Sequence, residues 1–251
     1  PSRTQKFEIC VTQMTLGPWK GPFYVSGAGS MSVILKALSM VLGKGAREAW
    51  VRKHEEFCSL AALGEADVLL LGDSITEGWR TGAGRNAWEK EFGTYRTANF
   101  GISGDRTHQI HWRLENWEMG SLRPKLVILL AGTNNLACKE SKEMIVESME
   151  LIINALQAMS PSATILLLGI LPRGRRGSRI RHQVLDVNGA LENLSNDRGL
   201  TFLDCGHRFL LEDGTIPKEL MPDKLHLSSS GYEVLADALR GVVHASMNGE
   251  G

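Results

Sequence analysis

A serine, a histidine and an aspartate occupy positions that suit nucleophilic catalysis. Ser74 follows an apolar run within Gly72-Asp73-Ser74, and Asp223 and His226 lie three positions apart near the other end of the chain. A serine hydroxyl is a weak nucleophile until a base removes its proton, and a turn from strand to helix exposes it. Asp223 can accept the Nδ1 proton of His226, which leaves Nε2 to face Ser74. The pattern therefore predicts a Ser–His–Asp triad.

Acyl transfer also needs hydrogen-bond donors where the carbonyl oxygen becomes negative. Gly104 and Asn134 can supply them, because glycine lets the backbone approach a ligand closely and asparagine carries an NH₂ donor on a short stem. Together with the Ser74 amide they predict an oxyanion hole. Taken singly, each of these residues is also explained by a helix cap or a turn, so the prediction depends on their occurring together.

Three side chains of middling size adjoin the predicted site in the sequence. Ile75, Thr133 and Leu225 each stand directly beside one of its residues. If they converge on the acyl group, they leave room for little beyond acetyl, because a longer chain would clash and displace the carbonyl from its donors. The alternative is an open groove for long chains, with the glycines at 82 and 84 marking a mobile rim.

The elements that position these residues are predicted to form a parallel sheet covered by helices. Apolar runs predict five strands, namely Asp67–Leu71, Arg96–Phe100, Leu126–Ala131, Thr164–Ile170 and Thr201–Asp204. Amphipathic patterns predict helices over Gly45–Leu63, Thr107–Trp117, Lys139–Met159, Ile180–Asn196 and Ser229–Ala245, the last opened by a run of three serines from Ser228. Ligands of such sheets bind beyond the carboxyl ends of the strands, where the candidate residues stand.

Composition favours one α/β domain and argues against several other classes of protein. A chain of 251 residues can bury a large core, and equal numbers of basic and acidic residues, 28 each, argue against a nucleic-acid partner. The four cysteines form no C-x-x-C pair, so we expect buried free thiols. No apolar stretch is long enough to span a membrane, so we expect a soluble protein, with the cytoplasm slightly favoured over export.

The first 44 residues are predicted to form an N-terminal extension that precedes the α/β domain, residues 45–251. Within the extension, Met31–Gly43 has the spacing of an amphipathic helix. The purpose of this segment does not follow from its sequence.

Four sequence blocks, in order, resemble those of the SGNH (GDSL-like) hydrolases: Gly72-Asp73-Ser74-Ile75-Thr76, the glycine block ending at Gly104, Gly132-Thr133-Asn134-Asn135 and Asp223-x-x-His226. Further runs are most similar to the platelet-activating-factor acetylhydrolase catalytic-subunit branch and its bacterial relatives: Asn99–Asp105, Trp112-Arg113-Leu114, Lys125-Leu126-Val127 and Leu171-Pro172-Arg173-Gly174. The resemblance covers about residues 46–246.

This resemblance implies a flavodoxin-like three-layer α/β sandwich with a five-stranded parallel sheet of order 2-1-3-4-5. It implies a serine esterase with Ser74 as nucleophile, Asp223 and His226 completing the triad, and Gly104 and Asn134 as oxyanion donors. It implies no metal and no other cofactor, and it is compatible with a homodimer. Residues 1–44 have no counterpart in the family core, and Ser103 replaces a glycine common in the branch, which could reshape the oxyanion loop.

The expected substrate is a small acyl ester, either an acetylated sugar, a lipid or a simple ester. A longer-chain lipase or thioesterase, or a dedicated carbohydrate O-deacetylase, is compatible with the same blocks because family members differ in their loops. A non-catalytic binding protein would be favoured by the loss of a site residue, and none is lost. A nucleotide binder would need a G-x-G-x-x-G after the first strand, and this chain lacks one there.

Two further groups of residues have alternative interpretations. His108, His111 and Glu115 share one face of a predicted helix and could suggest a metal site, although surface or packing roles are commoner for such histidines. Five arginines crowd the segment 173–181, which is interpreted first as a solvated loop and otherwise as a contact for an anionic substrate or a subunit.

Overall fold

The structure is a computed structural model that describes residues 44–116 and 121–249. The described residues divide between two units at Ser59, and helix α3 (Lys44–Leu63) runs across this division. The site described below lies wholly in the second unit, residues 60–251. The helix expected over Met31–Gly43 lies outside the described residues, and the proposed domain boundary at residue 44 stays a prediction.

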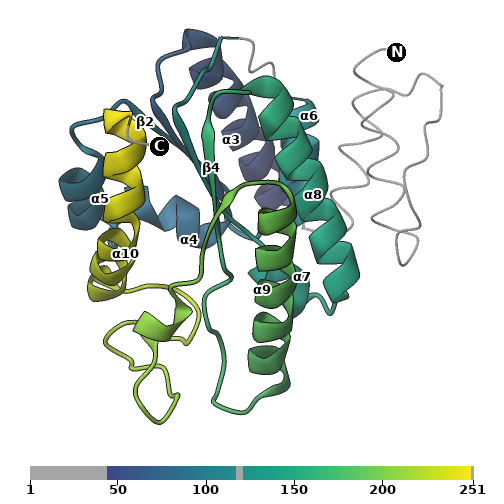
Figure 1. Ribbon diagram of the computed structural model, residues 1–251, viewed down its shortest axis with the longest axis vertical. Coiled ribbons are helices and arrows are strands. Elements are labelled where there is room, and N and C mark those ends of the chain that lie inside the picture. The colour runs from purple at the N-terminus through teal and green to yellow at the C-terminus, as the bar shows by residue number, and fades with distance from the viewer. Residues whose placement is uncertain (1–43, 117–120, 250–251) are drawn as a thin grey trace. The chain divides into compact units, whose positions relative to one another are not determined.

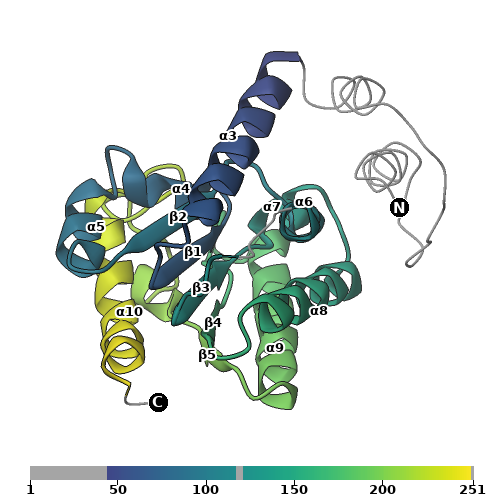
Figure 2. The same cartoon turned by 90° about the horizontal axis from the view of Figure 1, so that it is seen from above.

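A five-stranded parallel sheet forms the centre of the second unit. Its strands are β1 (Val68–Gly72), β2 (Thr97–Gly101), β3 (Leu126–Leu130), β4 (Thr164–Leu168) and β5 (Thr201–Leu203). Their order is β2-β1-β3-β4-β5, which confirms the expected topology (Figure 2). The register pairs Gly72 at the end of β1 with Gly101 of β2 and with Leu130 of β3, so these three strands end at the same edge.

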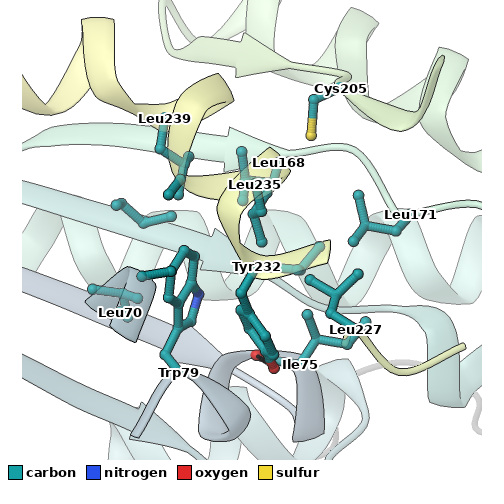
Figure 3. Packing of buried hydrophobic residues seen from close by; sticks show 14 of the residues in the cluster. Leu70, Ile75, Trp79, Leu168, Leu171, Cys205, Leu227, Tyr232, Leu235 and Leu239 are labelled. Carbon is teal, nitrogen blue, oxygen red and sulfur yellow. Dashed lines mark hydrogen bonds between the residues drawn. The ribbon is translucent and has the colours of Figure 1, made fainter. Parts of the chain in front are cut away.

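Helices cover both faces of the sheet, which explains why β1 and β3 are buried at every position. On one face lie α5 (Arg85–Phe92) and α10 (Ser229–Asn248), as Figures 1 and 2 show. On the other face lie α6 (Thr107–Glu115), α8 (Lys142–Met159) and α9 (Arg179–Asp197). Under α10, the sheet residues Leu70 and Leu168 pack with Leu235 and Leu239 of that helix (Figure 3).

Several short elements and helix boundaries differ from the sequence-based expectations. The expectations lack α4 (Ser74–Glu77), α5, α7 (Thr133–Ala137) and the two 3₁₀ turns, Gly78–Arg80 and Gly206–Phe209. Helix α8 begins at Lys142 and not at Lys139, because Lys139 has a left-handed backbone (φ 61°) and the Ser141 hydroxyl caps the helix by accepting from the Met144 amide at 3.3 Å. Helix α10 does begin at the serine run, with Ser228 as its cap.

The cysteines are only partly as expected. Cys205 is a buried free thiol, as predicted, whereas the prediction is wrong for Cys138, which is exposed at the end of the short helix α7. Cys58 is half-buried and Cys10 lies outside the described residues. No helix in residues 44–116 or 121–249 is both long and apolar enough to span a bilayer.

Candidate active site

Ser74 lies at the turn between β1 and α4, where the strand ends. The carboxylate of Asp73 caps α4, since its Oδ1 accepts from the Ile75 amide at 3.0 Å. Gly72 is required just before it, because a Cβ at this position would lie 2.2 Å from the Leu130 carbonyl oxygen. The turn therefore leaves the Ser74 side chain partly exposed at the carboxyl edge of the sheet, while its neighbours are buried.

The structure brings Ser74, His226 and Asp223 together from opposite ends of the domain. The Ser74 Oγ lies 3.1 Å from Nε2 of His226, and the other ring nitrogen, Nδ1, lies 2.6 Å from Oδ2 of Asp223. The side chains of His226 and Asp223 are 50% and 54% exposed, so substrate and water can reach them. This geometry suits an imidazole that carries its proton on Nδ1 and accepts the serine proton on Nε2.

A tight turn holds the histidine and the aspartate in this relation. Oδ1 of Asp223 accepts from the backbone amides of Leu225 at 3.0 Å and His226 at 2.7 Å. Lys224 between them has a left-handed backbone (φ 61°), which is unusual for a residue other than glycine. Partial burial raises the pKa of the Asp223 carboxyl, but the hydrogen bonds from His226 and Leu225 outweigh it and hold this pKa below its usual value. Asp223 is therefore ionised at neutral pH.

The two predicted oxyanion residues follow β2 and β3, the neighbours of β1. Gly104 lies on the loop after β2, and Asn134 is the second residue of α7. Gly104 has a left-handed backbone (φ 85°), which favours glycine at this position. Nδ2 of Asn134 donates to the Asp105 carbonyl at 2.9 Å, a bond that joins α7 to the loop after β2 and uses one of the two N–H groups of the Asn134 amide. The donor role of the second N–H, and of the Gly104 amide, stays a prediction.

A buried ion pair supports the loop that carries Gly104. Nη2 of Arg113 lies 2.8 Å from Oδ2 of Asp105, and neither side chain is exposed. The same Nη2 lies 3.5 Å from the carbonyl oxygen of Gly72, just before the nucleophile turn. Because breaking a buried pair leaves a buried charge, this pair fixes the loop firmly beside the end of β1.

Polar contacts that the sequence analysis did not predict attach β2 and the loop that carries Gly104 to α4. Oε2 of Glu77 accepts from the Ser103 amide at 2.8 Å. The buried Asn99 donates to the Thr76 carbonyl at 2.7 Å and accepts from the Gly101 amide at 3.0 Å. Asn99 does stand in the run Asn99–Asp105 of the family branch, but nothing in its type or spacing indicates these partners.

Tyr232 of α10 is a second unpredicted residue beneath the nucleophile turn. Its hydroxyl donates to the Ile75 carbonyl at 2.8 Å, and its ring centre lies 4.9 Å from that of Trp79 (Figure 3). Burial, with the nearby carboxyls of Asp73 and Glu77, raises the pKa of this phenol, which stays protonated and can donate. In the sequence it is indistinguishable from an ordinary core aromatic of an amphipathic helix.

The carboxyl of Asp73 is fully buried directly before the nucleophile. Burial raises its pKa to about 7, and the neighbouring Asp105 acts in the same direction. The hydrogen bond from the Ile75 amide and the charges of His226 and Arg173 lower it. The pKa of the Asp73 carboxyl thus lies well above its usual value.

The three residues expected to surround the acyl group differ in exposure. Ile75 and Thr133 are only 2% and 3% exposed, and Figure 3 shows Ile75 beside Leu227 and Tyr232 in the core. Leu225 is half-buried in the triad turn. All three residues are direct sequence neighbours of candidate site residues. Their contact with an acyl group stays a prediction.

The histidines considered for a metal site lie on α6. Nε2 of His111 is 3.9 Å from Oε1 of Glu115. Burial, with the charge of Arg106, lowers the pKa of His108 to about 4, so this imidazole is neutral. Among the described residues, no group of three His, Cys, Asp or Glu side chains could hold a metal ion.

Comparison with known proteins gives matches in both sequence and fold. Residues 70–234 match the GDSL-like Lipase/Acylhydrolase family. Over 195 residues the chain is 32% identical to platelet-activating factor acetylhydrolase IB subunit alpha1 of Rattus norvegicus, covering 77% of this chain and 82% of that protein.

Two solved structures share the fold. One is a GDSL-like lipase from Bacteroides thetaiotaomicron, with a TM-score of 0.65 at 18% identity over 77% of this chain and 98% of that one. The other is a catalytic mutant of an acetylxylan esterase from Geobacillus stearothermophilus, with a TM-score of 0.59 at 17% identity over 71% of this chain and 94% of that one. At these identities the similarity concerns the fold alone.

Proposed function

Because the chain belongs to the GDSL-like lipase/acylhydrolase family and is a carboxylic ester hydrolase, we propose that it cleaves short acyl esters, chiefly acetyl esters, through an acyl-serine intermediate on Ser74. The resemblance noted in the sequence is thereby confirmed at the level of the family. One observation carries the proposal: the unbroken line of contacts from Ser74 Oγ through the imidazole of His226 to the Asp223 carboxylate.

The proposed reaction has two halves. In the first, Ser74 Oγ bonds to the ester carbonyl carbon while His226 Nε2 takes the hydroxyl proton, and Asp223 stabilises the imidazolium. His226 then gives this proton to the leaving alcohol as the ester C–O bond breaks. In the second half, water attacks the acyl-serine and loses a proton to His226 Nε2. The imidazolium then returns this proton to Ser74 Oγ as the acyl C–O bond breaks, which releases the acid and restores both residues.

Asn134 is proposed as an oxyanion donor through the N–H that Asp105 does not use. Asn134→Ala should lower kcat by about 10²–10³-fold and leave KM nearly unchanged, because a hydrogen bond to the oxyanion forms chiefly in the transition state. Steady-state kinetics with p-nitrophenyl acetate measures both constants. Because the variant also loses the bond to Asp105, thermal unfolding should be followed in parallel. A large rise in KM with kcat intact would instead indicate ground-state binding.

The nature of the acyl group can be tested directly by chain length. If Ile75, Thr133 and Leu225 surround it, acetyl esters should exceed octanoyl esters in kcat/KM by about tenfold or more, a difference of about 1.4 kcal/mol. Ile75 and Thr133 are closely packed and could not easily move aside for a longer chain. Hydrolysis of acetyl, butyryl and octanoyl p-nitrophenyl esters measures this directly, and a maximum at octanoyl would favour the long-chain lipase or thioesterase.

The alcohol half of the substrate has two leading candidates. The relatives include platelet-activating factor acetylhydrolase subunits, and a solved structure of similar fold is an acetylxylan esterase, so an acetylated lipid and an acetylated carbohydrate are both candidates. A screen of acetylated sugars against acetylated phospholipids, at equal acetyl concentration, distinguishes these candidates from each other and from a simple ester.

A further inference from the structure

The segment that follows β4 joins two parts of the candidate site. Nη1 of Arg173 donates to both the carbonyl oxygen and the hydroxyl of Thr133, at 2.7 and 3.0 Å. The next residue, Gly174, donates its amide to the carbonyl of Lys224 at 3.0 Å. Gly174 has a left-handed backbone (φ 73°) that favours glycine. The segment thus connects α7, which begins at Thr133 and carries Asn134, with the turn that carries Asp223 and His226.

A buried arginine on α9 holds this segment in place. The side chain of Arg181 is bound by backbone carbonyls, with Nε donating to Arg173 at 3.3 Å, Nη2 to Gly174 at 3.1 Å and Nη1 to Gly214 at 3.2 Å. Arg181 is only 8% exposed. Each of the three guanidinium nitrogens thus has an acceptor on the segment or the neighbouring loop, and these bonds hold the backbone of Arg173 and Gly174 in place.

The position of Asn134 depends on anchors on both sides. Its side chain is held from one side by the Asp105 carbonyl at 2.9 Å. From the other side, Thr133 is held at both its carbonyl and its hydroxyl by the single nitrogen of Arg173. Gly132, just before, has a left-handed backbone (φ 115°), so this turn depends on such contacts to fix its direction. A shift of Thr133 would move the Asn134 N–H that is proposed to meet the oxyanion.

The charge of Arg173 is matched by the carboxyls around it. Partial burial lowers the pKa of the guanidinium, while Asp73 and Asp223 act against that shift. Asp73 directly precedes the proposed nucleophile and Asp223 belongs to the proposed triad, so the guanidinium interacts electrostatically with both parts of the site. A planar guanidinium suits a role with several directed hydrogen bonds better than the ammonium of lysine.

We propose that Arg173 is a positioning residue that holds Thr133, and through it the Asn134 donor, in register with the Asp223–His226 turn. This inference rests on the proposed function, in which Asn134 meets the oxyanion. The sequence analysis interpreted the segment 173–181 first as a solvated loop. Arg173, the first arginine of this segment, instead contacts Thr133 beside the candidate site.

The kinetic test compares Arg173→Met with the control Arg175→Met, an exposed arginine of the same loop. With p-nitrophenyl acetate, Arg173→Met should lower kcat by about 10- to 100-fold with KM changed by less than about twofold, because a small misplacement of the oxyanion donor acts on the transition state. The control should match wild type. The double variant with Asn134→Ala should be no slower than Asn134→Ala alone within about threefold, since both changes remove one effect.

A second measurement does not depend on hydrolysis. The side-chain NH₂ signals of Asn134, identified in ¹H–¹⁵N spectra by their loss in Asn134→Ala, should shift in Arg173→Met and remain in place in Arg175→Met. Arg173→Lys, which keeps the charge, should shift them less and serves if the Met variant does not fold. If the wild-type protein hydrolysed no ester, the proposed function would be wrong. The spectra would still show whether Arg173 positions the Asn134 side chain, so the two failures can be distinguished.

Two results would overturn the proposal. Unmoved Asn134 signals in a slow Arg173→Met enzyme would mean that Arg173 acts elsewhere. A raised KM for esters with an anionic alcohol half, with p-nitrophenyl acetate unaffected, would mean that the guanidinium binds substrate instead.

Discussion

Replacing Ser74 by alanine should reduce ester hydrolysis by at least about 10⁴-fold without unfolding the protein. The hydroxyl is the proposed nucleophile, and its hydrogen bond in the structure is to His226 Nε2 at 3.1 Å. It does not cap the helix, because Asp73 performs that role, and the side chain is partly exposed. The free energy of unfolding should therefore change by no more than about 0.5 kcal/mol. Initial rates with p-nitrophenyl acetate measure the loss of hydrolysis, and circular dichroism with thermal unfolding measures the change in stability.

Ser229→Ala is the matched control for this variant. Ser229 is an exposed serine at the first position of α10, three residues beyond His226, and it plays no part in the proposed reaction. It should retain wild-type turnover. If Ser74→Ala kept even a tenth of wild-type turnover after purification from host esterases, another nucleophile would have to be sought.

The sheet could be predicted well because its signal is local and strong. Runs such as Leu126–Leu130 are apolar at every position, and burial on both faces is what a parallel strand covered by helices requires. The strand order, in contrast, came from the family resemblance, since no periodicity specifies which strands are neighbours. The missed helices are short, since α4 and α7 span four and five residues and α5 spans eight. Helices α4 and α7 begin at Ser74 and Thr133, and neither serine nor threonine favours a helix strongly.

The residues of the candidate site likewise differ in whether a local sequence signal could identify them. Ser74, Asp223 and His226 could be named because each stands in a recognisable local motif, and the structure brings them into contact. Tyr232 and Arg173 could not be assigned their contacts, because each acts on a backbone carbonyl far away in the chain. Such contacts depend on how α10 and the β4 end pack against the turns, and the residue type alone does not specify them.

Asp223→Asn should lower kcat by about 10⁴-fold, because it reverses the proton arrangement on His226. The Oδ1 of Asp223 accepts from the amides of Leu225 and His226, so an asparagine oxygen will keep that place. Its NH₂ group must then take the place of Oδ2, which faces His226 Nδ1 at 2.6 Å. There it donates to Nδ1, and the imidazole proton moves to Nε2. A protonated Nε2 donates to Ser74 and cannot take its proton.

The turn itself should survive the Asp223→Asn substitution, which separates loss of catalysis from loss of structure. Asp213→Asn is the matched control, since Oδ1 of Asp213 likewise accepts from the backbone amide two residues on, that of Thr215, at 2.8 Å, and the residue is exposed. Both variants should show similar small changes in thermal unfolding, and only Asp223→Asn should lose turnover. An Asp223→Asn enzyme within about tenfold of wild type would mean that His226 holds its tautomer without the carboxylate, and the triad would reduce to a Ser–His pair.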